Sequence, residues 1–263
     1  MAERAADRWR EAASKWLLPQ SIIDAAPEPQ ATLDPEMFRY KPDLDATMPV
    51  RPSRRAALAA LPEGGSVLDV GCGGGASSFG LRSRAGFIIG VDRQPDMLLV
   101  FEETAQQFGV KVRTFLGAWP DVAEVVPVAD VAVCHHAFYA AEDLEAHVRA
   151  LTDHARERVV LEMSAHPPLV ALNPLLEKLH GTSRRDWPVA DLAQEVVTEL
   201  GYAVQREDVE LEPRPREVTP DWVGFVRRRL YVGPEADPVI EEFLRSQTPQ
   251  PQQVVALWWP GTA

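Results

Sequence analysis

Five short apolar stretches, separated by segments of helical character, alternate between residues 66 and 163, and this alternation constrains the fold most. The predicted strands cover residues 66–70, 87–91, 111–116, 130–134 and 158–163. The predicted helices between them cover residues 76–83, 95–108, 121–126 and 141–155. Helices of this length join parallel strands by right-handed crossovers and cover both faces of the sheet. We therefore predict an α/β fold with a doubly wound, mostly parallel sheet.

The flanking segments add two strands and several helices to this pattern. Apolar residues share one face of a predicted helix over residues 3–18. Residues 19–52 are rich in proline. A short helix is predicted over residues 53–61, with Ser53 as its N-cap. Later strands are predicted over residues 202–211 and 254–259, and later helices over residues 169–180, 189–200, 219–230 and 237–244. The sheet is therefore expected to have seven strands, with an N-terminal and a late helical cap.

The overall charge and composition favour a cytoplasmic protein without a nucleic-acid or membrane partner. Lys+Arg 27 against Asp+Glu 39 gives a net charge of −12, which opposes attraction to nucleic acids and anionic membranes. Arg227, Arg228 and Arg229 point about 100° apart on a helix, so we interpret them as a solvated face with one inward contact. The two cysteines are too few for a disulfide framework, and the N-terminus does not resemble a signal peptide.

Residues 67–75, VLDVGCGGG, place glycines at 71, 73, 74 and 75 directly after a buried strand. A glycine turn at this point lets a ligand approach the backbone N–H groups. Gly71, Gly73 and Ala76 fit the dinucleotide pattern G-x-G-x-x-A, which leaves an NAD-dependent oxidoreductase as one alternative. Asp69 would repel a pyrophosphate but attract a sulfonium or amino group. It therefore favours S-adenosylmethionine.

The segment from Asp69 to Gly75 resembles the first motif of class I S-adenosylmethionine-dependent methyltransferases, which have a Rossmann-like fold. The resemblance implies that Asp69, Gly71, Cys72 and Gly73 contact this cofactor. Three later segments resemble further motifs of the family: IIGVD (88–92), LGAWPDV (116–122) and ADVAVCHH (129–136). They imply that Asp92, with Arg93 beside it, takes the ribose hydroxyls, that Ala118 and Trp119 contact adenine, and that His135 lines the cofactor near the methyl group.

Histidines follow two neighbouring strands, where a general base for methyl transfer would be expected. His135, His136 and Tyr139 follow the fourth strand, and Glu162, Ser164 and His166 follow the fifth. We predict that His136, His135 or His166 deprotonates the acceptor, and we favour His136 because His135 is expected to line the cofactor. Tyr139 and Tyr40 are predicted to contact the substrate. No metal is predicted, because the H-E-x-x-H pattern is absent and Glu162 and His166 straddle a strand end.

The predicted function is transfer of a methyl group from S-adenosylmethionine to a small-molecule hydroxyl, on a sugar or secondary metabolite. The N-P-P-Y type of signature seen in methylation of nucleobases and protein amides is absent, since CHHAFY follows the fourth strand. A small-molecule amine acceptor and a non-catalytic protein that binds S-adenosylmethionine remain alternatives. Residues 1–52 are expected to form an N-terminal helix and substrate cap, and residues 53–263 the methyltransferase domain, with a helical insertion at about 213–250. The chain is expected to be a monomer or a homodimer.

Overall fold

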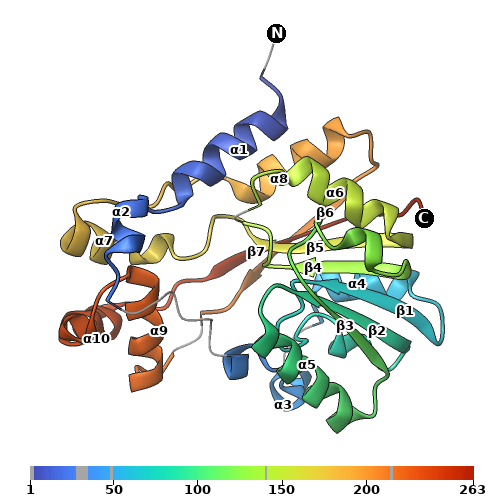
Figure 1. Ribbon diagram of the computed structural model, residues 1–263, viewed down its shortest axis with the longest axis horizontal. Helices are drawn as coiled ribbons and strands as arrows, with labels where there is room; N and C mark the ends of the chain where they lie inside the picture. Colours follow the sequence, from blue (N-terminus) through green and yellow to red (C-terminus); the bar gives the residue numbers. More distant parts are fainter. Residues whose placement is uncertain (1–2, 28–34, 48–49, 140, 214–215) are drawn as a thin grey trace.

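The computed structural model describes residues 3–27, 35–47, 50–139, 141–213 and 216–263 (Figure 1). Parts of the predicted N-terminal cap, residues 28–34 and 48–49, and residues 214–215 of the predicted insertion lie outside the described residues. No helix within the described ranges is both long and apolar enough to cross a bilayer.

Seven strands of the described chain form one sheet in the order β3-β2-β1-β4-β5-β7-β6, which confirms the predicted fold class. The strands are β1 (Gly65–Val70), β2 (Ala85–Asp92), β3 (Val112–Leu116), β4 (Ala129–His135), β5 (Ala155–Ser164), β6 (Gln205–Leu211) and β7 (Gln252–Pro260). Strands β1 to β5 pair in parallel, whereas β7 runs antiparallel to both β5 and β6. All parallel strands therefore end at one edge of the sheet, which is called the carboxyl edge below.

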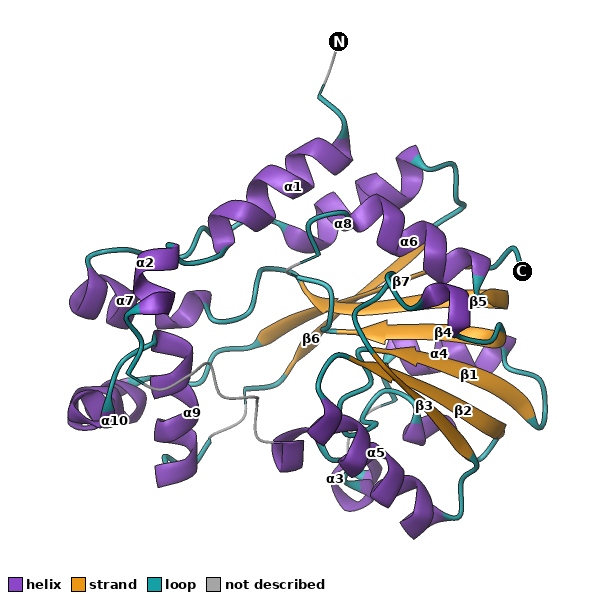
Figure 2. Ribbon diagram, in the orientation of Figure 1, coloured by secondary structure: helices purple, strands orange, loops and turns teal. Residues whose placement is uncertain are grey.

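Two groups of helices cover the two faces of the sheet (Figure 2). On one face, α1 (Ala5–Trp16), α6 (Leu144–Asp153) and α8 (Val189–Glu199) pack in a core that includes Leu68 and Leu161. On the other face, α4 (Pro52–Ala60) and α5 (Pro95–Phe108) pack in a core that includes Val67 and Val160. Neighbouring strand residues thus point to opposite faces, and both faces are apolar, as a doubly wound sheet requires.

A third core lies beyond the carboxyl edge and joins helices from distant parts of the chain (Figure 1). It combines α2 (Gln20–Asp24), α7 (Asn173–His180), α9 (Pro220–Leu230) and α10 (Asp237–Ser246). We call these four helices the helical cap. The sequence did not indicate that α7, which follows β5, belongs to it. The short helix α3 (Pro42–Ala46) lies outside this core.

Short connecting helices differ from the sequence prediction in two places. The predicted helix over residues 76–83 is wrong, because only a 3₁₀ turn forms, η2 (Phe79–Leu81). Ser77 is held against Asp69 at 2.8 Å, so the chain follows the glycine loop there. Residues 121–126 likewise form only the turn η3 (Ala123–Val125). Three further 3₁₀ turns are η1 (Pro35–Phe38), η4 (Val170–Leu172) and η5 (Pro234–Ala236).

Of the residues predicted to end or begin helices, one prediction is wrong and two are confirmed. The prediction that Ser53 caps its helix is wrong, because α4 begins at Pro52 and the Ser53 hydroxyl bonds to Glu162 instead. Thr219 is confirmed as the cap of α9, since its Oγ accepts from the Trp222 N–H at 3.2 Å. Gly201, with a φ of +87°, follows the end of α8 as predicted.

Candidate active site

The glycine loop after β1 wraps around the carboxyl end of β2. The N–H groups of Gly71 and Cys72 donate to the carbonyl of Val91 at 2.8 and 3.0 Å. The N–H of Gly73 donates to Oδ2 of Asp92 at 3.0 Å. The side chain of Cys72 is buried and belongs to the core beneath the loop. The loop therefore positions the Asp92 carboxylate with its backbone alone.

Three of the four glycines are required by contacts within the protein. A Cβ on Gly75, whose φ is +86°, would lie 2.0 Å from the buried ring of Phe79. A Cβ on Gly71, whose φ is +69°, would lie 2.2 Å from the Cβ of Ala137. A Cβ on Gly74 would lie 2.6 Å from the backbone of Arg39. In addition, the Tyr40 N–H donates to the Gly74 carbonyl at 3.0 Å. The N-terminal segment thus packs directly on the loop, and only part of the glycine pattern reflects ligand approach.

Asp69 and Asp92 form a pair of acids without a cationic partner. Asp69 is fully buried and accepts hydrogen bonds from the Ser77 hydroxyl at 2.8 and 2.7 Å. Burial raises the pKa of Asp69 to about 6, and the negative charge of Asp92 acts in the same direction. Neither carboxylate has an ion pair with any described residue. Gly73 contacts the Asp92 carboxylate through its N–H, and a Cβ on Gly73 would come no closer than 3.5 Å to Phe38. This space and charge fit a cationic ligand.

Two buried polar atoms at the carboxyl edge have no hydrogen-bond partner among the described residues: Nε2 of His135 and Oε1 of Gln94. His135 ends β4, and burial lowers its pKa to about 4, so the ring is neutral. Gln94 donates its backbone N–H to Asp92 at 2.9 Å. Beside them Leu116, the register partner of Asp92, leaves 58% of its surface exposed. Buried polar atoms normally find partners, so a ligand with polar groups and an apolar face fits here.

A hydrogen-bonded chain connects the ends of β4 and β5. His136 adopts a left-handed backbone, with a φ of 54°, and its N–H donates to the Glu162 carbonyl at 2.8 Å. Its ring places Nδ1 2.8 Å from the Tyr139 hydroxyl and Nε2 3.3 Å from Oε1 of Glu162. The Tyr139 hydroxyl also accepts the N–H of Ser164 at 2.9 Å. The structure therefore brings together His136, Tyr139 and Glu162.

The start of α4 supplies two further partners for Glu162, which is 2% exposed. Arg51 donates to Oε1 and the Ser53 hydroxyl donates to Oε2. Burial alone would raise the pKa of Glu162, but the His136 hydrogen bond and the Arg51 charge hold it below the usual range. Arg51 and Ser53 were not predicted as site residues, because they lie more than 100 residues before Glu162 and match no motif.

Three predicted site residues lie away from this cluster. His166 is exposed, with Nδ1 2.7 Å from Oδ1 of Asp186. Tyr40 is 5% exposed, and its hydroxyl donates to Asp45 at 2.7 Å. The indole of Trp119 donates to the His147 carbonyl in α6 at 3.3 Å and packs edge-on against His154. The remaining predicted residues, Arg93 and Ala118, are exposed and follow the ends of β2 and β3.

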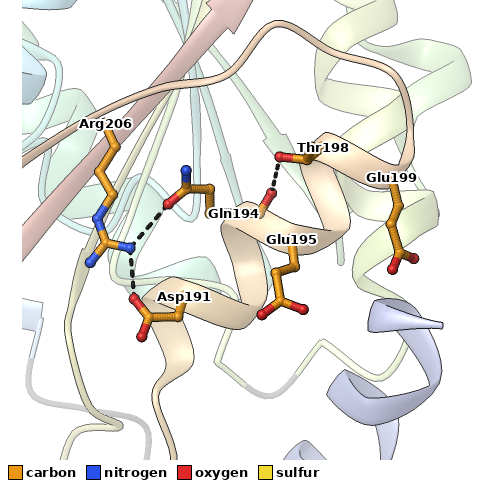
Figure 3. A pocket seen from close by; sticks show the side chains of 6 residues that line it. All are labelled: Asp191, Gln194, Glu195, Thr198, Glu199 and Arg206. Carbon is orange, nitrogen blue, oxygen red and sulfur yellow. Dashed lines mark hydrogen bonds and ion pairs between the residues drawn. The ribbon is translucent and has the colours of Figure 1, made fainter. Parts of the chain in front are cut away.

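A surface depression of about 490 Å³ lies on α8 and β6 and shares no residue with these clusters (Figure 3). It is lined by Asp191, Gln194, Glu195, Thr198, Glu199 and Arg206. Its charges are already paired, since Arg206 binds Asp191 at 2.6 Å and Glu199 accepts the Ala5 N–H. Within the described ranges, no group of three or more His, Cys, Asp or Glu side chains could hold a metal.

A scan of family models matches residues 61–200 to the methyltransferase domain family, which is more than half of the chain. The chain belongs to this family. As a methyltransferase it is an enzyme that uses S-adenosylmethionine, and the family match favours this function over the oxidoreductase and non-catalytic alternatives. No curated protein matches this methyltransferase.

Solved structures show the same fold at low sequence identity. The YcgJ protein of Bacillus subtilis is 19% identical, with a TM-score of 0.54, and the alignment covers 80% of this methyltransferase and 98% of YcgJ. The magnesium protoporphyrin IX methyltransferase of Synechocystis, solved with bound S-adenosylhomocysteine (SAH), is 14% identical, with a TM-score of 0.51. That alignment covers 97% of this methyltransferase and 93% of the Synechocystis enzyme. At these identities the likeness concerns the fold alone.

Proposed function

We propose that this methyltransferase transfers the methyl group to a hydroxyl group of a small molecule, with His136 as the general base. The observation that carries the proposal is the hydrogen-bonded chain Tyr139–His136–Glu162 at the ends of β4 and β5. Such a chain removes a proton, which a hydroxyl acceptor requires and which its high pKa makes difficult without a base. The net charge of −12 supports a small molecule over a nucleic acid as acceptor.

The proposed cofactor site uses residues at the carboxyl edge. Bound S-adenosylmethionine supplies a methyl group on a positively charged sulfur. The Asp92 carboxylate, positioned by Gly73, would accept the ribose hydroxyls, and Asp69 would favour the positive charge of the ligand. Nε2 of His135 and Oε1 of Gln94 are buried without a hydrogen-bond partner among the described residues, so polar groups of the ligand would pair with them. The exposed Leu116 would offer an apolar surface to adenine. Trp119 is not included in this proposed site, because its indole N–H donates to the His147 carbonyl in α6.

The proposed proton path runs through Tyr139. As the acceptor oxygen forms its bond to the methyl carbon and the sulfur–carbon bond breaks, the hydroxyl proton passes to the Tyr139 oxygen. The phenolic proton of Tyr139 passes at the same time to Nδ1 of His136. Burial raises the pKa of Tyr139 to about 12, so the phenol relays a proton and does not ionise. The Glu162 carboxylate stabilises the resulting imidazolium through Nε2–H.

We also propose that the helical cap and the N-terminal segment cover the acceptor. The cap lies beyond the carboxyl edge, where ligands bind in sheets of this type (Figure 2). It contains α2 from the predicted N-terminal cap of residues 1–52, and α9 and α10 from the predicted insertion at about 213–250. Residues Phe38 to Tyr40 reach the glycine loop itself.

The test has two stages. Calorimetric titration with SAH, and with NAD in parallel, first establishes that the purified protein binds the expected cofactor product. Methyl transfer from labelled S-adenosylmethionine is then measured on matched panels of small hydroxyl and amine compounds. Transfer to hydroxyls that His136→Asn abolishes, with SAH affinity unchanged, supports the proposal. Transfer confined to amines, or full turnover by His136→Asn, contradicts it.

A further inference from the structure

The last turn of α9 carries three consecutive arginines that differ in their surroundings. Arg227 forms an ion pair with Asp237 at 2.6 Å. Arg228 and Arg229 have no ion pair with any residue in the described part of the chain. Arg229 is only half-buried, so it is neither a freely solvated side chain nor a satisfied internal one. The predicted solvated face with one inward contact therefore accounts for Arg227, which pairs with Asp237, but leaves the half-buried Arg229 to be explained.

Aromatic rings hold Arg229 in place. Trp222 and Phe225 stack with ring centres 4.9 Å apart and planes 13° from parallel. The Arg229 guanidinium carbon lies 5.2 Å from the centre of the Phe225 ring, and that of Arg216 lies 3.5 Å from the Trp222 ring. A guanidinium on an aromatic face keeps its N–H groups free at the edge. The stack therefore presents Arg229 for a planar anion.

Positive charge around Arg229 is not compensated by acids. Arg184, 6% exposed, donates to the backbone carbonyls of Trp16 and Arg229, each at 3.2 Å, and has no ion pair with a described residue. Burial lowers the pKa of Arg229; the nearby Tyr231 opposes this shift, and the charges of Arg184 and Arg93 add to it. Buried cations without counter-charges are costly, and this chain carries twelve more negative than positive charges.

The position of Arg93 links this charge to the active site. Arg93 follows Asp92 at the end of β2, is exposed and has no ion pair with a described residue. Arg229 lies in α9, and the helical cap that contains α9 lies beyond this same carboxyl edge (Figure 1). The charge of Arg93 also lowers the pKa of Arg229, which agrees with this placement.

We propose that Arg229 and Arg93 bind an anionic group, a carboxylate or a phosphate, carried by the acceptor. The acceptor is then an anionic hydroxyl compound, and the bidentate N–H groups of arginine suit both anions. The identification of this anion as part of the acceptor rests on the proposed function, whereas anion binding by the two arginines does not.

Anion binding is tested on SAH-saturated protein by calorimetry, with inorganic phosphate and succinate as probes at constant ionic strength. We expect Arg229→Gln and Arg93→Gln each to weaken binding of at least one probe by about tenfold. Arg245→Gln is the matched control, because Arg245 is an exposed cap residue paired with Glu241. Arg93 is exposed, so its variant is expected to fold even if Arg229→Gln does not. Equal affinities in all four proteins overturn the proposal.

Two further measurements show whether the arginines bind an anionic group of the acceptor or the carboxylate of the cofactor. The SAH affinity of Arg229→Gln should match that of the wild type, and a tenfold loss there would assign the arginines to the cofactor carboxylate and overturn the proposal. Hydroxy acids and hydroxyalkyl phosphates should be methylated faster than their amides or neutral esters, and Arg229→Gln should remove that preference. Arginine-dependent anion binding without hydroxyl methylation refutes the proposed function but not the anion site. Methylation of neutral hydroxyls without arginine-dependent anion binding refutes the anion site but not the proposed function.

Discussion

Nδ1 of His136 lies 2.8 Å from the hydroxyl oxygen of Tyr139. That oxygen already accepts the N–H of Ser164, so its own proton is directed to Nδ1. Nε2 then carries the imidazole proton and donates it to Glu162. The neighbours of His136 therefore set its tautomer before any acceptor binds. The unprotonated Nδ1 faces Tyr139, and the protonated Nε2 faces the Glu162 carboxylate.

Replacing either member of this pair should slow methyl transfer without affecting cofactor binding. We expect His136→Asn to lower kcat by about 10²–10⁴, the usual contribution of a general base. Tyr139→Phe should also lower kcat, because the phenyl ring keeps the packing but cannot relay a proton. Labelled methyl transfer measures both effects, and SAH calorimetry checks binding.

His166→Ala provides the control for these variants, since His166 is exposed and paired with Asp186. It should retain wild-type kcat. A loss of activity in His166→Ala as large as that in His136→Asn would contradict the assignment of the base.

Arg51 is expected to act as a positioning residue through Glu162. Its charge lowers the pKa of Glu162, so Arg51→Gln should let this carboxyl protonate at a higher pH. The groups facing Glu162 are Arg51, Ser53, His135 and His136. The acid limb of the kcat profile should therefore move to higher pH in the variant.

Arg55→Gln serves as the comparison, because Arg55 lies on the same helix but pairs with the exposed Glu207. Its pH profile should match that of the wild type. If Arg51→Gln lowers activity equally at every pH, Arg51 only supports the fold.

Asp69→Asn should stabilise the protein at alkaline pH and weaken cofactor binding. The folded pKa of Asp69, about 6, lies above its ordinary value of 3.8. Stability from this group is therefore present below pH 4 and is lost as the pH rises through 6, by at most about 3 kcal/mol. The variant should remove this loss, so its free energy of unfolding at pH 8 should exceed that of the wild type. Denaturant unfolding at pH 4 and pH 8 measures the difference.

The same substitution tests the role of Asp69 in binding. A carboxylate that favours the cationic ligand must be ionised, so wild-type affinity for S-adenosylmethionine should fall below pH 6. The affinity of Asp69→Asn should be lower and should not change across this range. Equal affinities of the two proteins at pH 8 would count against a cofactor role.

Gly74→Ala should disturb the contact between the N-terminal segment and the glycine loop. A Cβ at this position would lie 2.5 Å from the Phe38 carbonyl oxygen, so the segment must shift, at a cost of about 1–3 kcal/mol. Proteolysis near residues 35–40 should become faster. Gly109→Ala is the matched comparison, because a Cβ there meets nothing within 4 Å and only its φ of +65° opposes the change, by about 1 kcal/mol. Similar proteolysis of both variants would show that the contact does not hold the segment.

Local pattern was sufficient for the sheet and for the loop, since both depend on neighbours in sequence. Apolar runs of five or six residues with helices between them predict parallel strands, and Asp69 followed by glycines predicts the turn after β1. The helix predicted over residues 76–83 failed because the hydrogen bond between Ser77 and Asp69 overrides the helical preference of the segment.

The sequence by itself determined the fold class, the glycine loop after β1 and the strand ends at which His135, His136, Tyr139 and Glu162 lie. The tertiary structure alone decided which of these side chains meet. It joined Arg51 and Ser53 to Glu162, turned Trp119 onto α6, buried Tyr40 against Asp45, and left His166 on the surface. These contacts connect residues far apart in the chain, and side-chain direction at a strand end depends on packing that no local pattern encodes.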